Sequence, residues 1–349
     1  MPCVAIDLFC GIGGLTKGLS LAGIDVVAGF DIDESCRFAY EVNNNAEFLC
    51  QDVTNIQGQL LNQFYPDNAI RVLVGCAPCQ PFSRYSSRYR KEGHTDNKWM
   101  LLYSFGRLVR ECLPDIVSME NVPNLIHEDV FKDFVNELET NGYFVDYSIV
   151  YCPDYGVPQH RKRLVLLASR LGTINLIPPI YNEGNYLSVR DAIANLPPIA
   201  AGEICEADIL HRSGSLSVLN LRRIQQSIPG GTWREWDDEL KLDCHTKDSG
   251  RTFPSVYGRM EWDKPSPTIT TQFYGYGNGR FGHPEQNRAI SLREGAILQS
   301  FPDDYIFVDD EHPAKKRELG THIGNAVPVE LGRAIGESIR RHVERMREE

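Results

Sequence analysis

The chain of 349 residues opens with Val4-Ala5-Ile6-Asp7-Leu8-Phe9-Cys10-Gly11-Ile12-Gly13-Gly14, followed by an apolar helical pattern. Residues 4–9 predict a buried strand, residues 10–14 a tight turn, and residues 15–22 a helix with one apolar face. Strand, glycine turn and helix in this order make a βα unit. We therefore expect an α/β domain at the start of the chain.

The same alternation continues beyond this unit. Strands are predicted at 26–31, 71–75 and 115–119, and helices near 34–43, 97–112 and 128–140. Two further strands, at 143–150 and 163–168, have little helix between them, so we expect the sheet to end in an antiparallel pair. Residues 1–171 are thus predicted to form a Rossmann-like domain with a mostly parallel sheet.

A second region begins after Ser169, where the regular alternation stops. Pro178-Pro179, Pro197-Pro198 and a glycine- and tyrosine-rich stretch at 273–282 interrupt any long periodicity. We predict a smaller, irregular domain over 172–288. A C-terminal segment, 289–349, should return to the first domain and end in a helix from about Val329.

Composition excludes several classes of protein. The apolar fraction is 42%, the charged fraction 24%, and no apolar run is long enough to span a membrane. The N-terminus lacks a basic leader, and ten scattered cysteines suit reduced thiols, so we expect a cytoplasmic protein. The net charge of −11 argues against nucleic acid as a partner. Residues 84–110, however, carry a local excess of positive charge that could attract phosphate.

The glycine turn and two acids predict a site for an adenosine ligand. Asp31 follows Gly11 by 20 residues, the spacing at which an acid binds ribose hydroxyls. The turn is not a GxGxxG sequence, which favours a ligand smaller than a dinucleotide. Asp52 lies after a third strand and could meet the adenine amino group. The alternatives are a purely structural turn and a helix N-cap at Asp52.

Reactive side chains follow three of the predicted strands. Cys79 lies in a loop at the carboxyl end of strand 71–75, where open α/β sheets bind ligands, and Glu120 ends the strand at 115–119. Arg161 and Arg163 should share one face by the period of two. Cys76 and Cys79 could instead be a redox pair. No second CxxC completes a zinc site, so we expect no metal.

Taken in order, five blocks of sequence resemble the DNA (cytosine-5)-methyltransferases. They are Asp7–Gly14, Ala77–Ser83, Glu120–Val122, Gln159–Arg163 and Gly324–Pro328, and Arg293–Pro302 fits the segment before the last block. Five blocks in order over nearly the whole chain are specific to this family. The resemblance implies the class I S-adenosylmethionine-dependent methyltransferase fold and assigns 172–288 to target recognition.

The resemblance implies a covalent mechanism on a cytosine flipped out of double-stranded DNA. Cys79, beside Gln80, would add to C6, and Glu120 would hold N3 and the exocyclic amine. Arg163 would contact O2 of the base, and Arg161 would help to stabilise the thiolate or a neighbouring phosphate. Cys76 is interpreted as a residue without a catalytic role that packs beside the loop.

The resemblance also implies S-adenosyl-L-methionine as cofactor and S-adenosyl-L-homocysteine as product. The residues expected to bind it surround the glycine turn and the neighbouring strand ends. They are Phe9, Gly11, Ile12, Gly14, Asp31, Ile32, Asp52, Val53, Pro78, Leu101, Asn325 and Ala326. Asp31 stands where the family usually has Glu, which shortens its reach to the ribose.

DNA contacts are expected from polar and basic residues of two regions. These are Ser83, Arg84, Arg88, Arg222, Arg234, Arg251 and Arg280. The expected protein is a monomeric, nucleoid-associated bacterial methyltransferase of a type II restriction-modification system, with a cognate endonuclease for the same site and no membrane partner. Alternatives are a tRNA cytosine-5 methyltransferase, a catalytically inactive DNA-binding relative and a thiol redox protein.

Overall fold

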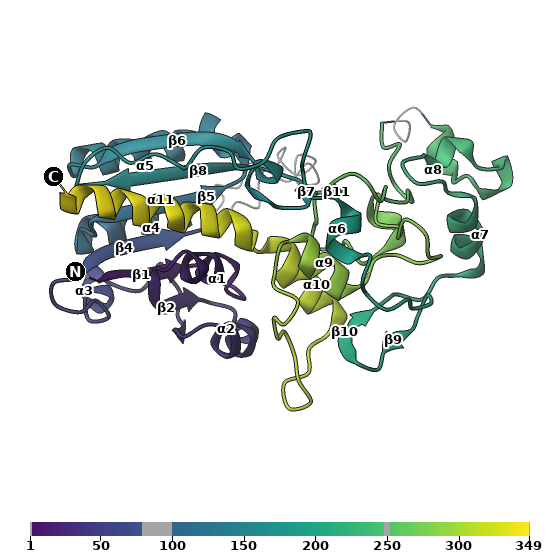
Figure 1. The fold of residues 1–349 in the computed structure, drawn as a ribbon, viewed down its shortest axis with the longest axis horizontal. Coiled ribbons are helices and arrows are strands. Elements are labelled where there is room, and N and C mark those ends of the chain that lie inside the picture. The colour runs from purple at the N-terminus through teal and green to yellow at the C-terminus, as the bar shows by residue number, and fades with distance from the viewer. Residues whose placement is uncertain (1, 79–99, 248–251, 349) are drawn as a thin grey trace. The chain divides into compact units, whose positions relative to one another are not determined.

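The computed structural model describes residues 2–78, 100–247 and 252–348 (Figure 1). The chain divides into two compact units, each built from separate stretches of sequence. Unit 1 comprises residues 1–155, 162–180 and 327–349, and unit 2 comprises residues 156–161 and 181–326. Because each unit has its own packing, each is described by itself.

Unit 1 is built on a seven-stranded sheet with the strand order β3-β2-β1-β4-β5-β8-β6. The five strands from β3 to β5 run parallel, whereas β8 is antiparallel to both β5 and β6. The sheet therefore ends in the antiparallel pair that the sequence predicts. The strands are β1 (Cys3–Leu8), β2 (Asp25–Asp31), β3 (Glu47–Cys50), β4 (Ile70–Gly75), β5 (Ile116–Asn121), β6 (Phe144–Tyr151) and β8 (Lys162–Ser169).

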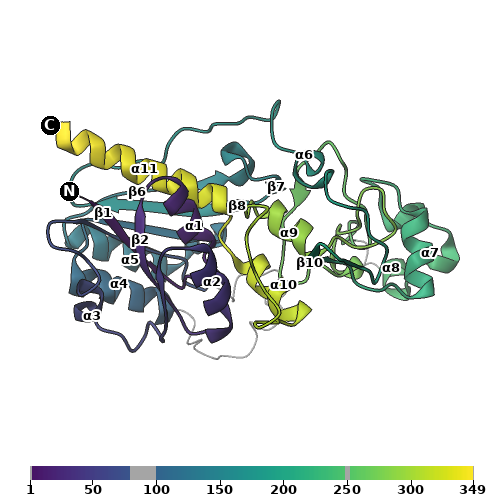
Figure 2. The same ribbon diagram turned by 60° about the horizontal axis from the view of Figure 1, so that its bottom comes forward.

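Helices cover both faces of this sheet. In Figure 2, α1 and α11 lie on one side and α3, α4 and α5 on the other. The helices are α1 (Gly14–Leu21), α2 (Arg37–Asn43), α3 (Gly58–Asn62), α4 (Met100–Cys112), α5 (Asp129–Thr140) and α11 (Val329–Glu348), with 3₁₀ turns η1 (Glu34–Cys36), η4 (Pro123–His127) and η5 (Cys152–Tyr155). Among the described helices, none is both long and apolar enough to cross a bilayer.

The core of unit 1 follows from the period of two along its strands. Val4, Ile6 and Leu8 of β1 point into one hydrophobic cluster with Phe105 of α4 and Phe134 of α5. All five side chains are at most 3% exposed. The predicted Rossmann-like α/β class, with its mostly parallel sheet, is confirmed.

Close packing of α1 against α11 depends on glycine. A methyl group on Gly18 would lie 2.4 Å from the main-chain oxygen of Val329 and 2.5 Å from the main-chain nitrogen of Arg333. Only glycine lets the two backbones approach so closely. The C-terminal helix is thereby fixed beside the first βα unit, within the same unit of the fold.

Unit 2 contains short elements joined by long irregular segments. Its helices are α6 (Val189–Ile193), α7 (Val218–Gln226), α8 (Asp243–Thr246), α9 (Leu292–Leu298) and α10 (Lys316–Asn325), and its 3₁₀ turns are η6 (Trp233–Glu235), η7 (Asp238–Leu240) and η8 (Tyr276–Asn278). The strands β9 (Ile204–Cys205) and β10 (Asp208–Arg212) pair antiparallel, and β7 (Gln159–His160) pairs parallel with β11 (Ser266–Pro267).

The boundary between the units differs from the predicted segments. Residues 289–326 belong to unit 2, and only the chain from residue 327 onward belongs to unit 1. The cause is packing within unit 2: a methyl group on Gly295 of α9 would lie 2.0 Å from the Phe273 ring, and one on Gly324 of α10 would lie 2.5 Å from the main chain of Thr270. Residues 172–180 likewise belong to unit 1.

Candidate active site

The glycine turn after β1 is held closed by Asp31. Gly11 N donates a hydrogen bond to Asp31 Oδ2 at 2.8 Å. Phe9, Gly11 and Gly13 have φ of 59°, 51° and 82°, a left-handed backbone that glycine adopts readily and Phe9 does not. Ile12 is buried, and Gly14 begins α1. The acid 20 residues after Gly11 therefore lies directly against the turn.

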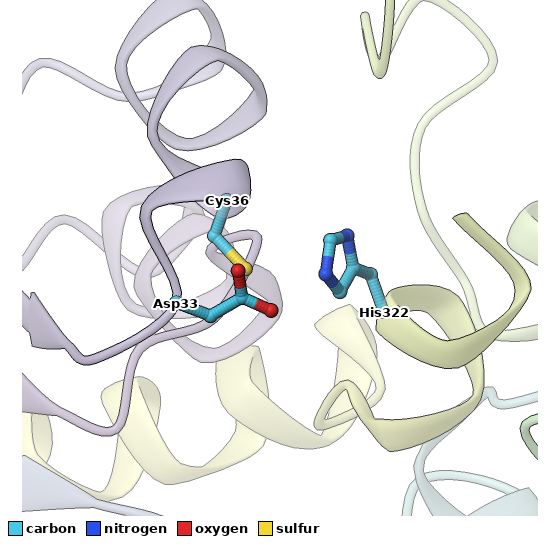
Figure 3. Close-up of side chains that lie close together, drawn as sticks. All are labelled: Asp33, Cys36 and His322. Atoms are coloured by element: carbon cyan, nitrogen blue, oxygen red, sulfur yellow. The ribbon is translucent and has the colours of Figure 1, made fainter. Parts of the chain in front are cut away.

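The segment after β2 forms the adjoining edge of unit 1. Asp31 Oδ1 accepts a hydrogen bond from Asp33 N at 2.9 Å, and Ile32 leaves 69% of its surface exposed. Figure 3 shows Asp33 and the buried Cys36 on the following turn; His322, drawn there too, belongs to α10 of unit 2. A large apolar side chain beside an oriented carboxylate suits a flat ring joined to a sugar.

Asp52 and Val53 follow β3 and differ in what they can offer a ligand. Asp52 Oδ1 accepts a hydrogen bond from Thr54 N at 2.9 Å, and Asp52 lines a cavity of 440 Å³ with Asn55 and Ile56. Val53 is 2% exposed and packs in the core. The role predicted for Val53 in cofactor binding stays a prediction; with its side chain in the hydrophobic cluster, its main chain is the part that can face a ligand.

A second carboxylate, Asp7, is buried beneath the turn. Its Oδ2 accepts a hydrogen bond from Thr16 Oγ1 at 2.7 Å, and among the described residues its Oδ1 has no hydrogen-bond partner. Burial raises the pKa of Asp7 to about 7, against the hydrogen bond from Thr16, which lowers it. The sequence shows this acid inside an apolar strand, but not its partners.

This raised pKa predicts how stability depends on pH. A carboxyl with a higher pKa in the folded than in the unfolded chain loses its stabilising contribution as pH rises from about 4 to about 7. An Asp7→Asn variant avoids that loss, so at pH 8 it should be more stable by about 2 kcal/mol. Thermal unfolding at pH 5 and pH 8 measures the gain, which should shrink at the lower pH. A gain that is equal at both pH values would contradict the prediction.

The catalytic carboxylate predicted at the end of β5 lies next to one of the predicted arginines. Glu120 is 2% exposed and pairs across the ladder with Val165 of β8, two residues from Arg163. This register places Glu120 and Arg163 as diagonal neighbours on one face. Arg163 Nε and Glu120 Oε1 form an ion pair at 2.8 Å, with 14% of the Arg163 side chain exposed.

Two residues at the end of β4 and β5 were not assigned a role from sequence. Cys76 Sγ donates a hydrogen bond to Glu120 Oε2 at 2.8 Å, and Asn121 Nδ2 donates one to Ala77 O at 2.9 Å. The interpretation that Cys76 packs beside the loop without a role of its own did not include this contact with the carboxylate. A signal was present in the sequence: both residues lie at the carboxyl end of a predicted strand.

The remaining predicted cofactor residues come from three segments of the chain. Pro78 is exposed after β4, and Leu101 is half-buried in the first turn of α4. Asn325 ends α10 and Ala326 follows it, both in unit 2. Six predicted residues lie outside the described parts of the chain: Cys79, Gln80, Ser83, Arg84, Arg88 and Arg251.

Arg161 does not share a face with Arg163. It lies between β7 and β8 and belongs to unit 2, where it is 3% exposed. Its guanidinium donates hydrogen bonds to Ile269 O at 3.1 Å and Ala326 O at 3.5 Å. The prediction from the period of two is wrong because β8 begins only at Lys162. These two contacts lie within unit 2, and the role predicted for Arg161 at the thiolate or a phosphate stays a prediction.

The described arginines of unit 2 that were predicted to contact DNA have protein partners. Arg280 donates a hydrogen bond to Gly231 O at 2.6 Å, and Arg222 forms an ion pair with Glu239. The Arg234 guanidinium lies 5.5 Å from the centre of the Trp233 ring. Arg280 thus connects two loops through main-chain oxygens, whereas Arg222 and Arg234 lie at exposed positions.

The fold and this site define a class of protein. A parallel sheet that ends in an antiparallel pair, with an acid-closed glycine turn after β1, is the class I methyltransferase fold. The family model for C-5 cytosine-specific DNA methylases matches residues 4–341. The chain belongs to this family and is a DNA (cytosine-5)-methyltransferase.

Known proteins of similar sequence extend over the whole chain. The type II methylase M.HgiDII of Herpetosiphon aurantiacus is 53% identical over 100% of this chain and 98% of its own length. The type II methyltransferase M1.BsuMI of Bacillus subtilis is 32% identical over 93% of this chain and 77% of its own length.

Solved structures share the fold. A protein encoded within an E. coli prophage and described as a DNA modification methyltransferase has a TM-score of 0.75 at 21% identity, covering 98% of this chain and 99% of its own. The Dnmt2 methyltransferase of S. pombe has a TM-score of 0.60 at 16% identity, with 99% of each chain covered. These likenesses concern the arrangement of helices and strands.

Proposed function

We propose that this enzyme transfers the methyl group of S-adenosyl-L-methionine to C5 of a cytosine flipped out of a specific double-stranded DNA site, through a covalent bond between Cys79 and C6. The observation that carries the proposal is the buried Glu120, held by Arg163 and Cys76 at the end of β5. Since β4 and β5 are parallel neighbours, the loop after β4 that contains Cys79 starts beside this carboxylate.

Cytosine C5 is a weak nucleophile, and the proposed chemistry activates it. The Cys79 thiolate adds to C6, and the electron pair of the C5–C6 double bond becomes available at C5. Glu120 holds N3 and the exocyclic amine while charge develops on the ring, and Arg163 contacts O2. After C5 accepts the methyl group, loss of the C5 proton restores the double bond and expels Cys79 as a thiolate.

The residues around the glycine turn fit the proposed methyl donor. The donor is an adenosine with a sulfonium and an ammonium group and no phosphate, and it supplies an electrophilic methyl group when bound. Asp31 at the turn and Asp52 after the neighbouring strand β3 bring carboxylates to this edge of unit 1, and carboxylates favour a cation and disfavour a phosphate. Asp31 is oriented to accept from ribose hydroxyls, and Ile32 offers an exposed apolar surface to adenine.

The experiment that tests the proposal incubates the protein with methyl-labelled S-adenosylmethionine and either unmethylated bacterial DNA or tRNA. We expect label in 5-methylcytosine of DNA with the native protein and none with Cys79→Ser. A duplex with 5-fluorocytosine in the methylated site should trap a covalent complex, since fluorine cannot leave C5 as the proton does. Label only in tRNA would overturn the substrate, and label without Cys79 would overturn the covalent mechanism.

We further propose that the enzyme acts as a monomer and protects host DNA against a cognate endonuclease. The support for the protective role is the type II methylase named among its relatives at 53% identity over the whole chain. DNA from cells that express the native protein should resist an endonuclease that cuts the methylated site, and DNA from cells with Cys79→Ser should not. Sedimentation of the protein with and without duplex tests the monomer.

A further inference from the structure

We infer that Cys76 is a positioning residue, whose thiol holds the Glu120 carboxylate in the orientation that receives the target base. This inference rests on the proposed function and extends it by one residue. It concerns three side chains of unit 1: Cys76 and Glu120 at the carboxyl ends of β4 and β5, and Arg163 at the amino end of the antiparallel strand β8.

The backbone around Cys76 is fixed on both sides. Cys76 N donates a hydrogen bond to Leu8 O at 3.3 Å, which continues the β1–β4 ladder by one residue. The next carbonyl, Ala77 O, accepts from Asn121 Nδ2 at 2.9 Å. These contacts fix the position of the Cys76 main chain, and one side-chain rotamer then places the thiol 2.8 Å from Glu120 Oε2.

The carboxylate receives a different partner on each oxygen. Arg163 Nε pairs with Oε1 at 2.8 Å, and Cys76 Sγ donates to Oε2 at 2.8 Å. With Glu120 only 2% exposed, these contacts fix its side-chain torsions. Arg163 holds Oε1 by its charge, since among the described residues Oε1 accepts no hydrogen bond, whereas the thiol is a weak neutral donor to Oε2.

This asymmetry gives Cys76 a specific use in the proposed reaction. Before DNA binds, the thiol keeps a buried carboxylate oxygen from lacking a partner. When the target base enters, its exocyclic amine is the stronger donor and can replace the thiol on Oε2, while Arg163 stays on Oε1. The carboxylate would then meet the base already oriented.

Three variants test the role. Cys76→Ala removes the donor, Cys76→Ser keeps a donor of similar shape, and Cys3→Ala changes another half-buried cysteine of unit 1 that lies in β1. We expect kcat of Cys76→Ala to fall about tenfold with KM for DNA unchanged, Cys76→Ser to stay within about twofold of the native enzyme, and Cys3→Ala to match it.

A second measurement reports the contact without any methyl transfer. The rate at which iodoacetamide alkylates Cys76, followed by mass spectrometry of its peptide, should rise about tenfold in Glu120→Gln, because a neighbouring carboxylate opposes formation of the thiolate. If the native enzyme labels no cytosine, the proposed function fails while this measurement still tests the contact.

Three outcomes would overturn the inference. Cys76→Ser as slow as Cys76→Ala would mean that size or sulfur matters and donation does not. Loss of all activity in Cys76→Ala, as in Cys79→Ser, would mean that Cys76 does more than position Glu120. Alkylation of Cys76 at the same rate with and without the Glu120 charge would mean that the two groups do not interact.

Discussion

Replacing Glu120 by glutamine should lower the rate of methyl transfer by about 100-fold to 1,000-fold. Glutamine has nearly the same shape, but it carries no negative charge and cannot exchange a proton with the base. Arg163 would lose the charge that it pairs with at 2.8 Å, in a position where 14% of its side chain is exposed. We therefore expect the variant to stay folded while its rate of methyl transfer falls.

Single-turnover transfer of labelled methyl to a duplex measures this effect. Calorimetric titration with S-adenosylhomocysteine should give nearly the same affinity for both proteins, because Glu120 lies at the end of β5 and the turn that we assign to the cofactor follows β1. Glu139→Gln, an exposed substitution on α5, is the matched control and should keep full activity. A Glu120→Gln enzyme with more than half of the native rate would remove Glu120 from the mechanism.

The sequence predicts the framework of unit 1 because that framework repeats a local pattern. Apolar residues at 4–9, 26–31 and 71–75 each precede a turn and a helix, and the period of two identifies the buried face. Glu120 and Arg163 could be predicted as candidates for the same reason: each lies at an end of a strand whose neighbours are known from the alternation. The positions of these two residues follow from strands that the sequence predicts.

Contacts between distant residues could not be predicted in this way. The hydrogen bond from Cys76 to Glu120 spans 44 residues, and it depends on the register of two strands as well as on a side-chain rotamer. Arg280 and Arg161 were predicted for their charge, but they hold main-chain oxygens in unit 2. A charge in a sequence does not indicate whether its partner is a phosphate or a carbonyl of the same chain.

A buried ion pair in unit 2 leads to the second prediction with a large effect. Arg288 is 0% exposed and Glu294 1% exposed, and the two pairs of atoms Nη1–Oε2 and Nη2–Oε1 are each 2.7 Å apart. Burial alone would raise the pKa of Glu294, but the hydrogen bonds from Arg288 hold it below its usual value. Glu294 also accepts from Ser291 N at 2.6 Å and so caps α9.

Glu294→Gln should therefore destabilise the protein by about 3–5 kcal/mol, because it leaves the Arg288 charge buried without a counterion. Urea unfolding followed by tryptophan fluorescence measures the loss, since Trp233, Trp236 and Trp262 all lie in unit 2. The control is Glu344→Gln, which removes an exposed pair with Arg340 on α11 and should cost at most about 1 kcal/mol.

A double variant separates the charge from the packing. In Arg288→Met with Glu294→Leu both charges of this pair are removed, so the two substitutions together should be less harmful than Glu294→Gln alone. If the double variant is instead the less stable of the two, the hydrogen bonds from Ser291 N to Glu294 and from Arg288 to Ala289 O outweigh the cost of the buried charge. That result would make the network around α9, rather than its ion pair, the source of stability in unit 2.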